Sequence, residues 1–322
     1  MSRIHEALKK AEQERAASQA SAQPRFATGA DSAADGSTES SPHEHSGMAP
    51  HAHPSGMPVM DAVYEHSMPA FGNVVSLDTL LARCPQMPWK PEEKTMLFFN
   101  GDDSARGTEE FRTLRSRLYH AREKMPLKKI LVTSALPKEG KSFTAANLAQ
   151  VMVKQHGRRA LLIDADLRGP QLHSMLGANA SPGLAEYLQA ATDEFSIMQR
   201  GPMENLFFIA SGQQISDPAE LVANGRLKLL LERVEALFDW IVIDSPPAVP
   251  VSDASVLAKA CDGVLIVVRS NSTPVDMARR AREEFPDQAL VGVVLNGMEH
   301  SPTHYSQYYY QTYVKKTTEV KS

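Results

Sequence analysis

The sequence is poor in cysteine and has no long apolar run, and both features narrow the class of protein. Cys84 and Cys261 are the only cysteines among 322 residues, so we expect neither a disulfide framework nor a zinc cluster, which fits a reducing compartment. No stretch reaches the roughly 18 apolar residues that a membrane-spanning helix needs, and the first residues lack the apolar core of a secretion signal. We therefore expect a cytoplasmic protein, and any association with the membrane must come through a partner.

The sequence also lacks a strong charge of either sign. The formal net charge is -4, which gives no reason to expect nonspecific binding to nucleic acid or to acidic lipid. Hydrophobic residues make up 42% and charged residues 22%, as in ordinary globular proteins. A chain of this length has room for one large domain with tails, or for two small domains.

Residues 1–100 differ in composition from the rest of the chain. Residues 2–15 predict a short amphipathic helix, which is either frayed or docked on another surface. Residues 16–69 are rich in Ser, Ala, Gly, Pro and His and are typical of a linker. The linker histidines could bind metal, but a solvated, compositionally biased tract is the favoured interpretation because no cysteine or acidic cluster accompanies them. A helix at Leu77–Ala82 and a strand at Met96–Phe99 are possible in the remainder.

From Thr108 onward, short apolar runs alternate with amphipathic stretches. Continuous apolar strands separated by helices predict an α/β fold with a mostly parallel sheet and helices on both faces. We expect a domain at 101–300 between the N-terminal region at 1–100 and a polar tail at 301–322. The predicted strands are 129–134, 160–164, 205–211, 240–245, 263–269 and 290–296, and the predicted helices are 142–155, 219–238, 252–260 and 274–285.

A phosphate-binding loop follows the first predicted strand. Residues Ala135–Ser142 match the P-loop pattern with Ala in place of the first Gly. Backbone N–H groups of such a loop, together with the helix N-terminus, form a donor surface for phosphate. Gly140 allows close backbone approach, Lys141 supplies charge to the β- and γ-phosphates, and Ser142 offers a hydroxyl to Mg²⁺. An ordinary loop before a helix-starting Ser is the alternative, and the context of strand, loop and helix weighs against it. The predicted nucleotide-binding residues are Pro137, Lys138, Glu139, Gly140, Lys141, Ser142, Phe143 and Asn296.

Carboxylates stand at the ends of two further predicted strands. Asp164 and Asp166 follow one, and Asp244 follows the other, so we expect all three at the carboxyl edge of the sheet, where ligands bind in open α/β folds. A lone Asp there is usually a cap or turn residue. Three of them beside a phosphate loop favour a metal-binding or catalytic role. Asp164 and Asp244 suit a metal site with Ser142, and Asp166 could accept a proton from an attacking hydroxyl. With Lys141, these three are the predicted catalytic residues.

With these motifs the chain resembles the bacterial tyrosine kinases of capsule and exopolysaccharide synthesis. That family carries a Walker A loop, an Asp-x-Asp-x-Arg strand and an Asp-x-x-Pro strand, which occur here in order as Ala135–Ser142, Asp164–Arg168 and Asp244–Pro247. The resemblance covers about residues 105–313. It implies a P-loop NTPase-like fold, a tyrosine kinase that uses ATP and Mg²⁺, and an adenine contact at Asn296.

The resemblance also implies a ring of copies. The family's Glu-x-x-Arg-x-x-Arg motif matches at Glu109, Arg112 and Arg115. If these three residues stood alone, a solvated, salt-bridged helix face would be the default interpretation. The MinD/ParA regulatory ATPases share the fold and are the alternative. They carry a lysine five positions before the loop lysine, and that position is Leu136 here.

The tail holds five of the eight tyrosines. The resemblance implies that they are the acceptors, phosphorylated in trans around the ring, although an aromatic strand or an interface patch remains the alternative. It further implies a separate membrane co-polymerase that activates the kinase, for which the helix at 2–15 is a candidate docking element, and a phosphotyrosine phosphatase that resets the tail. The tyrosines are Tyr305, Tyr308, Tyr309, Tyr310 and Tyr313.

Overall fold

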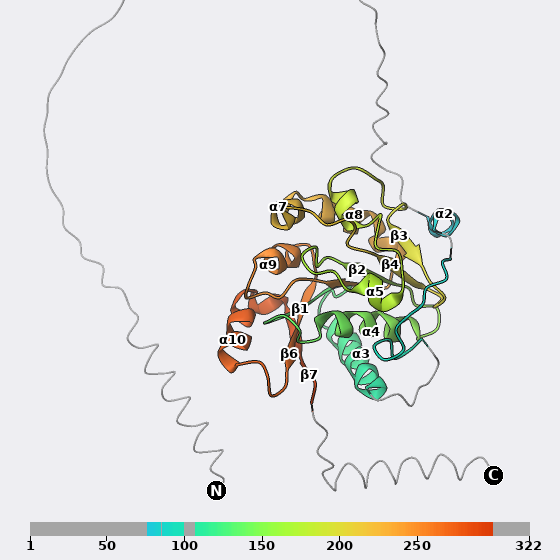
Figure 1. Cartoon of the computed structure of the whole chain (residues 1–322). Helices are drawn as coiled ribbons and strands as arrows, with labels where there is room; N and C mark the ends of the chain where they lie inside the picture. The colour runs from blue at the N-terminus through green and yellow to red at the C-terminus, as the bar shows by residue number, and fades with distance from the viewer. Residues whose placement is uncertain (1–75, 85, 100–106, 299–322) are drawn as a thin grey trace, which may run out of the picture. The chain divides into compact units, whose positions relative to one another are not determined.

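The computed structural model describes residues 76–84, 86–99 and 107–298 (Figure 1). All of them fall in one compact unit, residues 67–322. The predicted helix at 2–15, the histidine tract and the tail tyrosines lie outside the described residues.

The fold is built on a seven-stranded sheet in the order β3-β4-β2-β5-β1-β6-β7. Neighbouring strands pair in parallel except β3, which pairs antiparallel with β4. Parallel strands place all their carboxyl ends at one edge, so the loops that follow them meet there. The strands are β1 (Lys129–Ser134), β2 (Ala160–Asp164), β3 (Met198–Arg200), β4 (Leu206–Ile209), β5 (Trp240–Asp244), β6 (Gly263–Arg269) and β7 (Leu290–Asn296).

Helices cover both faces of this sheet (Figure 1). Successive strand residues point to opposite faces, so Leu131 joins the core beneath one layer of helices while Ile130 and Val132 join the core beneath the other. The helices are α2 (Leu77–Arg83), α3 (Thr108–Arg122), α4 (Lys141–Val153), α5 (Leu172–Leu176), α6 (Leu184–Leu188), α7 (Pro218–Ala223), α8 (Arg226–Val234), α9 (Asp253–Ala258) and α10 (Val275–Glu283), with 3₁₀ turns η1 (Glu235–Leu237) and η2 (Asp287–Ala289).

The α/β prediction is confirmed, including all six predicted strands, of which β4 and β5 are shorter than expected. The single helix predicted over 219–238 is wrong. Gly225 adopts φ +80, a left-handed conformation that ends helices, so this stretch divides into α7, α8 and η1.

Residues 86–99 pack along β3, α5 and α4 and extend the fold toward the N-terminus. The strand predicted at Met96–Phe99 is wrong, because the segment forms turns. The N–H groups of Leu97 and Phe98 donate to the side chains of Asn147 (2.9 Å) and Gln150 (3.3 Å) instead of to a strand. The predicted helix near 77–82 is confirmed as α2. Part of the region assigned to 1–100 therefore contributes buried side chains to the core, among them Leu80, Trp89, Met96 and Phe98.

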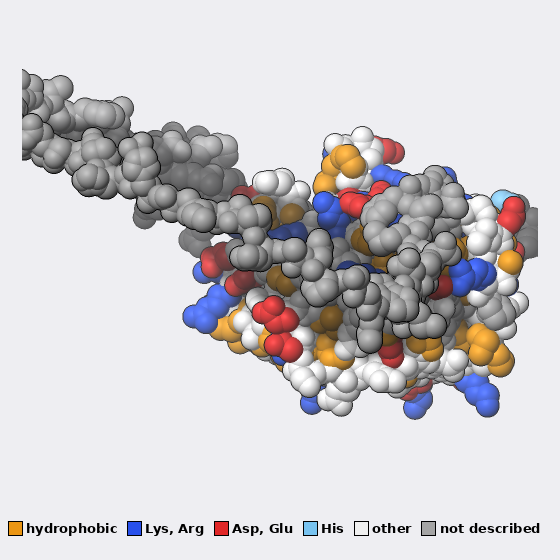
Figure 2. Space-filling model, turned by 90° about the horizontal axis from the view of Figure 1, so that it is seen from above, with side chains coloured by type: hydrophobic (Ala, Val, Ile, Leu, Met, Phe, Trp, Pro, Cys, Tyr) orange, Lys and Arg blue, Asp and Glu red, His pale blue; other side chains and the backbone are white. Residues whose placement is uncertain are grey.

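The surface shows mixed charge. On the face in Figure 2, Lys and Arg side chains of the described residues are interspersed with Asp and Glu. A search of the described residues finds no helix long and apolar enough to cross a membrane.

Candidate functional site

The predicted phosphate loop lies between β1 and α4, in the order strand, loop and helix. Gly140 adopts φ +95 and caps α4, whose helical N–H groups begin at Lys141. A Cβ on Gly140 would lie 2.0 Å from the Asn296 side-chain nitrogen, so this side chain would have to move, and the positive φ itself favours glycine. Lys138 is also left-handed, at φ +66. The predicted structural context of strand, loop and helix is present.

Glu139 ties the loop to its surroundings and is 3% exposed. Its carboxylate accepts the Leu136 N–H at 2.8 Å and the hydroxyl of Thr273. Asn296 donates to the Glu139 carbonyl at 2.9 Å, and Arg269 donates to the Lys138 carbonyl at 3.3 Å. The ends of β6 and β7 therefore fix the backbone of the loop.

Lys141 lies among the three predicted carboxylates and pairs with two of them, Asp166 and Asp244. Its Nζ lies 2.6 Å from Asp166 Oδ2 and 3.7 Å from Asp244 Oδ2, and it donates to Ser142 Oγ at 3.1 Å. Burial lowers the pKa of Lys141, but the charges of Asp244 and Asp166 outweigh it and raise the pKa above its ordinary value. The ammonium therefore stays charged at the centre of an acidic group.

Asp164 and Asp244 lie opposite one another in the register of β2 and β5, and each is at most 1% exposed. Burial raises the pKa of Asp164 to about 8, helped by the charge of Asp244. Burial also raises the pKa of Asp244 to about 6, opposed by Lys141. Neither Asp244 oxygen has a partner in hydrogen-bonding geometry, whereas Asp164 accepts the N–H groups of Asp166 (3.3 Å) and Leu172 (3.1 Å).

The loop after β2 is held by two further contacts. Asp166 Oδ1 accepts the Gly169 N–H at 3.0 Å, leaving Oδ2 on Lys141. Arg168 binds Asp253 with two hydrogen bonds, of 2.8 and 3.0 Å. Asp253 begins α9 and is 1% exposed. The last residue of the Asp-x-Asp-x-Arg motif therefore joins this loop to the helix that follows β5.

Asn296 and Phe143, which were both predicted to contact the nucleotide, have different neighbours. The Asn296 amide is hydrogen-bonded to the loop backbone at Glu139, and its oxygen accepts the Gly297 N–H at 2.9 Å. Phe143 packs edge-on against Phe111 of α3, with ring centroids 5.8 Å apart. Both side chains line the same hollow beside the loop.

The motif at Glu109, Arg112 and Arg115 lies on α3. Glu109 and Arg112 form an ion pair on the helix surface. Arg115 instead donates to the Val151 carbonyl near the end of α4, at 2.9 Å. One residue of the motif therefore holds α3 on α4, while Glu109 remains more than half exposed.

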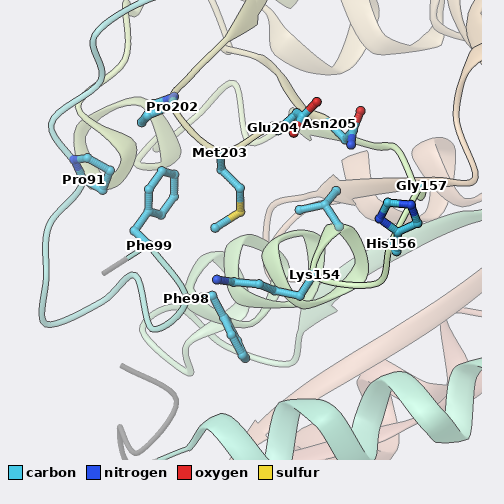
Figure 3. Close-up of a pocket in the computed structure, with 11 residues that line it drawn as sticks. Pro91, Phe98, Phe99, Lys154, His156, Gly157, Pro202, Met203, Glu204 and Asn205 are labelled. Carbon is cyan, nitrogen blue, oxygen red and sulfur yellow. The ribbon is translucent and has the colours of Figure 1, made fainter. Parts of the chain in front are cut away.

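Figure 3 shows a second cavity, of about 600 Å³, lined by the turn at 91–99, the end of α4 and residues 202–205. The side chains of Phe99, Met203 and Lys154 lie around this space. Its lining includes residues just before β2 and β4, at the opposite edge of the sheet from the loop. None of its lining residues belongs to the phosphate loop.

Sequence reasoning missed the residues that support the loop. Arg269 ends β6 and Thr273 lies just after it, in a stretch without a motif. Only the tertiary fold brings these residues to Lys138 and Glu139. Arg168 could be singled out from the sequence because it belongs to the Asp-x-Asp-x-Arg motif. Its partner Asp253 belongs to no such motif. Across the described ranges, no group of three or more His, Cys, Asp or Glu side chains is arranged as a metal cage.

Comparison with known proteins fits this geometry. The family model described as "ParA: NUBPL iron-transfer P-loop NTPase" matches residues 127–320. Tyrosine-protein kinase YwqD of Bacillus subtilis is 35% identical over 208 residues, which are 64% of this chain and 86% of that protein. The chain belongs to the bacterial tyrosine kinases within this P-loop NTPase family.

Other bacterial tyrosine kinases agree. Tyrosine-protein kinase CpsD of Streptococcus agalactiae is 30% identical over 208 residues, covering 63% of this chain and 90% of CpsD. The kinase domain of Escherichia coli tyrosine kinase ETK superposes with a TM-score of 0.59 at 28% identity, over 66% of this chain and 85% of that domain. The chain covers only 26% of the length of the putative tyrosine-protein kinase EpsB of Ralstonia nicotianae.

Proposed function

We propose that this tyrosine kinase transfers the γ-phosphoryl group of ATP to its own tail in a neighbouring copy, and thereby regulates exopolysaccharide or capsule synthesis and export. One observation carries the proposal. A single buried ammonium, Lys141, lies within 4 Å of a candidate proton acceptor, Asp166, and of a candidate metal ligand, Asp244. The acceptors are Tyr305, Tyr308, Tyr309, Tyr310 and Tyr313.

Phosphate entry changes the partners of Lys141. In the structure the ammonium is paired with Asp166, and phosphate oxygens at the N-terminus of α4 would draw it away. Asp166 then has a free carboxylate oxygen that orients the tyrosine hydroxyl and takes its proton. The tyrosine oxygen forms a bond to phosphorus as the bond to the leaving ADP oxygen breaks.

The residues present fit Mg²⁺. Mg²⁺ keeps several waters and takes one or two protein carboxylates. The buried Asp244 carboxylate accepts no hydrogen bond in normal geometry and lies near Lys141, so it suits that role together with Ser142. Asp164 is the weaker ligand, because both its oxygens already accept backbone N–H groups. When bound, Mg²⁺ neutralises charge on the phosphate oxygens. The rest of the nucleotide would contact Pro137–Phe143, with the adenine near Asn296.

The proposed assembly is a ring of copies joined through Glu109, Arg112 and Arg115. The kinase domain at 101–300 would present the tail at 301–322 to the next copy. We further propose a cytoplasmic protein held at the inner face of the membrane by a separate co-polymerase activator and reset by a phosphotyrosine phosphatase.

Incubation of the purified chain with Mg²⁺ and ATP, followed by phosphotyrosine-specific mass spectrometry, tests the activity. We expect modification of the tail, and none in Lys141→Ala. Absence of phosphotyrosine despite ATP hydrolysis, even with the activator present, would favour the alternative of a MinD/ParA-like regulatory ATPase. The broad family match is the observation that supports this alternative, and Leu136 at the position of the extra lysine weighs against it.

Mixing two proteins that cannot phosphorylate themselves tests transfer between copies. Lys141→Ala retains the acceptors but has no working loop, whereas deletion of residues 299–322 retains the loop but has no acceptors. Together they should yield phosphotyrosine on the Lys141→Ala chain. A mixture that stays unmodified, when the intact chain modifies itself, would show that transfer occurs within one copy.

A further inference from the structure

Glu139 places an acidic side chain inside the predicted phosphate loop, where a negative charge opposes the binding of phosphate. The residue is 3% exposed, so salt screens its charge less than that of a surface carboxylate. Lys138 and Gly140 on either side of it are both left-handed, at φ +66 and +95. A loop of this kind presents successive backbone N–H groups to an anion. A carboxylate in the middle of the loop competes for these N–H groups unless it is held elsewhere.

Two hydrogen bonds hold the Glu139 carboxylate within the protein. Its Oε2 accepts the N–H of Leu136, in the same loop, at 2.8 Å. Its Oε1 accepts the hydroxyl of Thr273, which is 134 residues away along the chain. Thr273 lies in the turn between β6 and α10, so one of the two bonds comes from outside the loop.

The hydroxyl of Thr273 is oriented for this contact. Its oxygen accepts the Arg269 N–H at 3.1 Å. A hydroxyl has one proton to donate, and the bond from Arg269 leaves that proton for the Glu139 carboxylate. Hydrogen bonds to an ionised group are stronger than those between neutral groups. The Thr273 proton is therefore well suited to fix the position of the carboxylate.

Two further contacts hold the backbone of the loop. The Arg269 guanidinium donates to the Lys138 carbonyl at 3.3 Å, and the Asn296 amide at the end of β7 donates to the Glu139 carbonyl at 2.9 Å. Both contacts act on main-chain oxygens. The Thr273 hydroxyl has a different effect, because it acts on the charged side chain.

We propose that Thr273 is a positioning residue of this kinase, whose hydroxyl keeps the Glu139 carboxylate away from the phosphate-binding N–H groups and thereby supports the affinity for ATP. The inference rests on the proposed function, in which ATP occupies the loop. In Thr273→Val one oxygen of a buried carboxylate loses its donor, which is unfavourable. That oxygen would then compete with phosphate for the N–H groups of the loop.

Equilibrium binding of ATP with Mg²⁺ to the full chain tests the inference. We expect Thr273→Val to weaken binding about tenfold, as the loss of a donor to a buried charged acceptor would give. Thr273→Ala removes the same donor and should behave alike, whereas Thr273→Ser restores the hydroxyl and should restore the affinity. Ser272→Ala is the matched control, because it removes an exposed hydroxyl from the same turn, and it should bind ATP as the original chain does.

The kinetics of tail phosphorylation provide a second readout. Thr273 acts on the binding of ATP and not on the proton acceptor Asp166. The KM for ATP should therefore rise in Thr273→Val by about the same tenfold factor, while kcat falls by less than about threefold. Equal losses in kcat and in kcat/KM would contradict a role in positioning the loop for ATP.

A double-mutant cycle with Glu139→Gln separates this role from general support of the fold. Because the amide carries no charge, the Thr273→Val change should weaken ATP binding by less than about twofold in that background. An effect equally large with and without the Glu139 charge would overturn the inference, and so would undiminished ATP binding by Thr273→Val. If the original chain does not bind ATP, the proposed function fails and this inference fails with it. Failure of the cycle alone would leave the proposed function standing.

Discussion

Asp164 and Asp244 face each other across β2 and β5, and this register places two buried carboxylates side by side. Burial raises the pKa of both, to about 8 for Asp164 and about 6 for Asp244. Burying two adjacent ionised carboxylates is energetically unfavourable without a neighbouring positive charge. Such a pair therefore suits a site that binds a cation. The same register has a measurable consequence for stability.

The first prediction concerns pH. A carboxyl whose pKa is higher in the folded than in the unfolded protein binds its proton more tightly when folded, so the free energy of unfolding falls as pH rises between the two pKa values. For Asp164 this window runs from 3.8 to about 8. In Asp164→Asn, which keeps an acceptor for the Leu172 N–H, the fall should be reduced. Urea unfolding without nucleotide at pH 5 and pH 8 measures it, and identical pH dependence in the two proteins would contradict the burial argument.

The second prediction separates proton transfer from nucleotide binding. Asp166→Asn preserves the side-chain shape and the acceptor for the Gly169 N–H but cannot take a proton. We expect tail phosphorylation to slow by about 10²- to 10⁴-fold, while ATP affinity stays within a few-fold of the original. Single-turnover phosphorylation and equilibrium nucleotide binding provide the two readouts. If both fall together, Asp166 acts by shaping the loop.

The third prediction concerns the glycine of the loop. In Gly140→Ala the new Cβ meets the Asn296 side chain at 2.0 Å, at φ +95. We expect a loss of about 1 to 3 kcal/mol in stability from the strained backbone, and at least a tenfold loss in ATP affinity because the loop must shift.

Gly157→Ala is its control, because Gly157 is also left-handed, at φ +72, but a Cβ there meets no atom within 4 Å. The control should lose stability without losing ATP affinity. Equal affinity in Gly140→Ala and the original protein would show that the loop tolerates the side chain.

The fourth prediction concerns the pair Arg168 and Asp253. Arg168→Met leaves the buried Asp253 carboxylate without its two hydrogen bonds, which should cost about 1 to 3 kcal/mol. Arg168→Lys should recover only part of this, since an ammonium cannot make the same two-pronged contact. Chemical denaturation of both variants, each combined with Asp253→Asn, yields the coupling energy. Additive effects would show that the contact contributes nothing.

The sequence by itself predicted the layered α/β fold, which the structure confirms, and it named the candidate site residues. Continuous apolar runs such as 129–134 and 160–164 are typical of strands that are buried on both faces of a parallel sheet. The local spacing of the loop motif identifies Gly140, Lys141 and Ser142. Carboxylates at strand ends were predicted to gather at one edge because parallel strands end together. The structure brings Asp164, Asp166 and Asp244 around Lys141 as expected.

Only the tertiary structure decided which groups lie against the loop. Strand order and register follow from the packing of distant segments, so sequence could not show that Asp164 would pair with Asp244, that Arg168 would bind Asp253, or that Thr273 would reach Glu139. Nor could it show that β7 would be an edge strand with Val293 and Leu295 exposed, because the same apolar residues would be buried in a central strand. Local spacing fixes which atoms can do chemistry, whereas long-range packing fixes which of them meet.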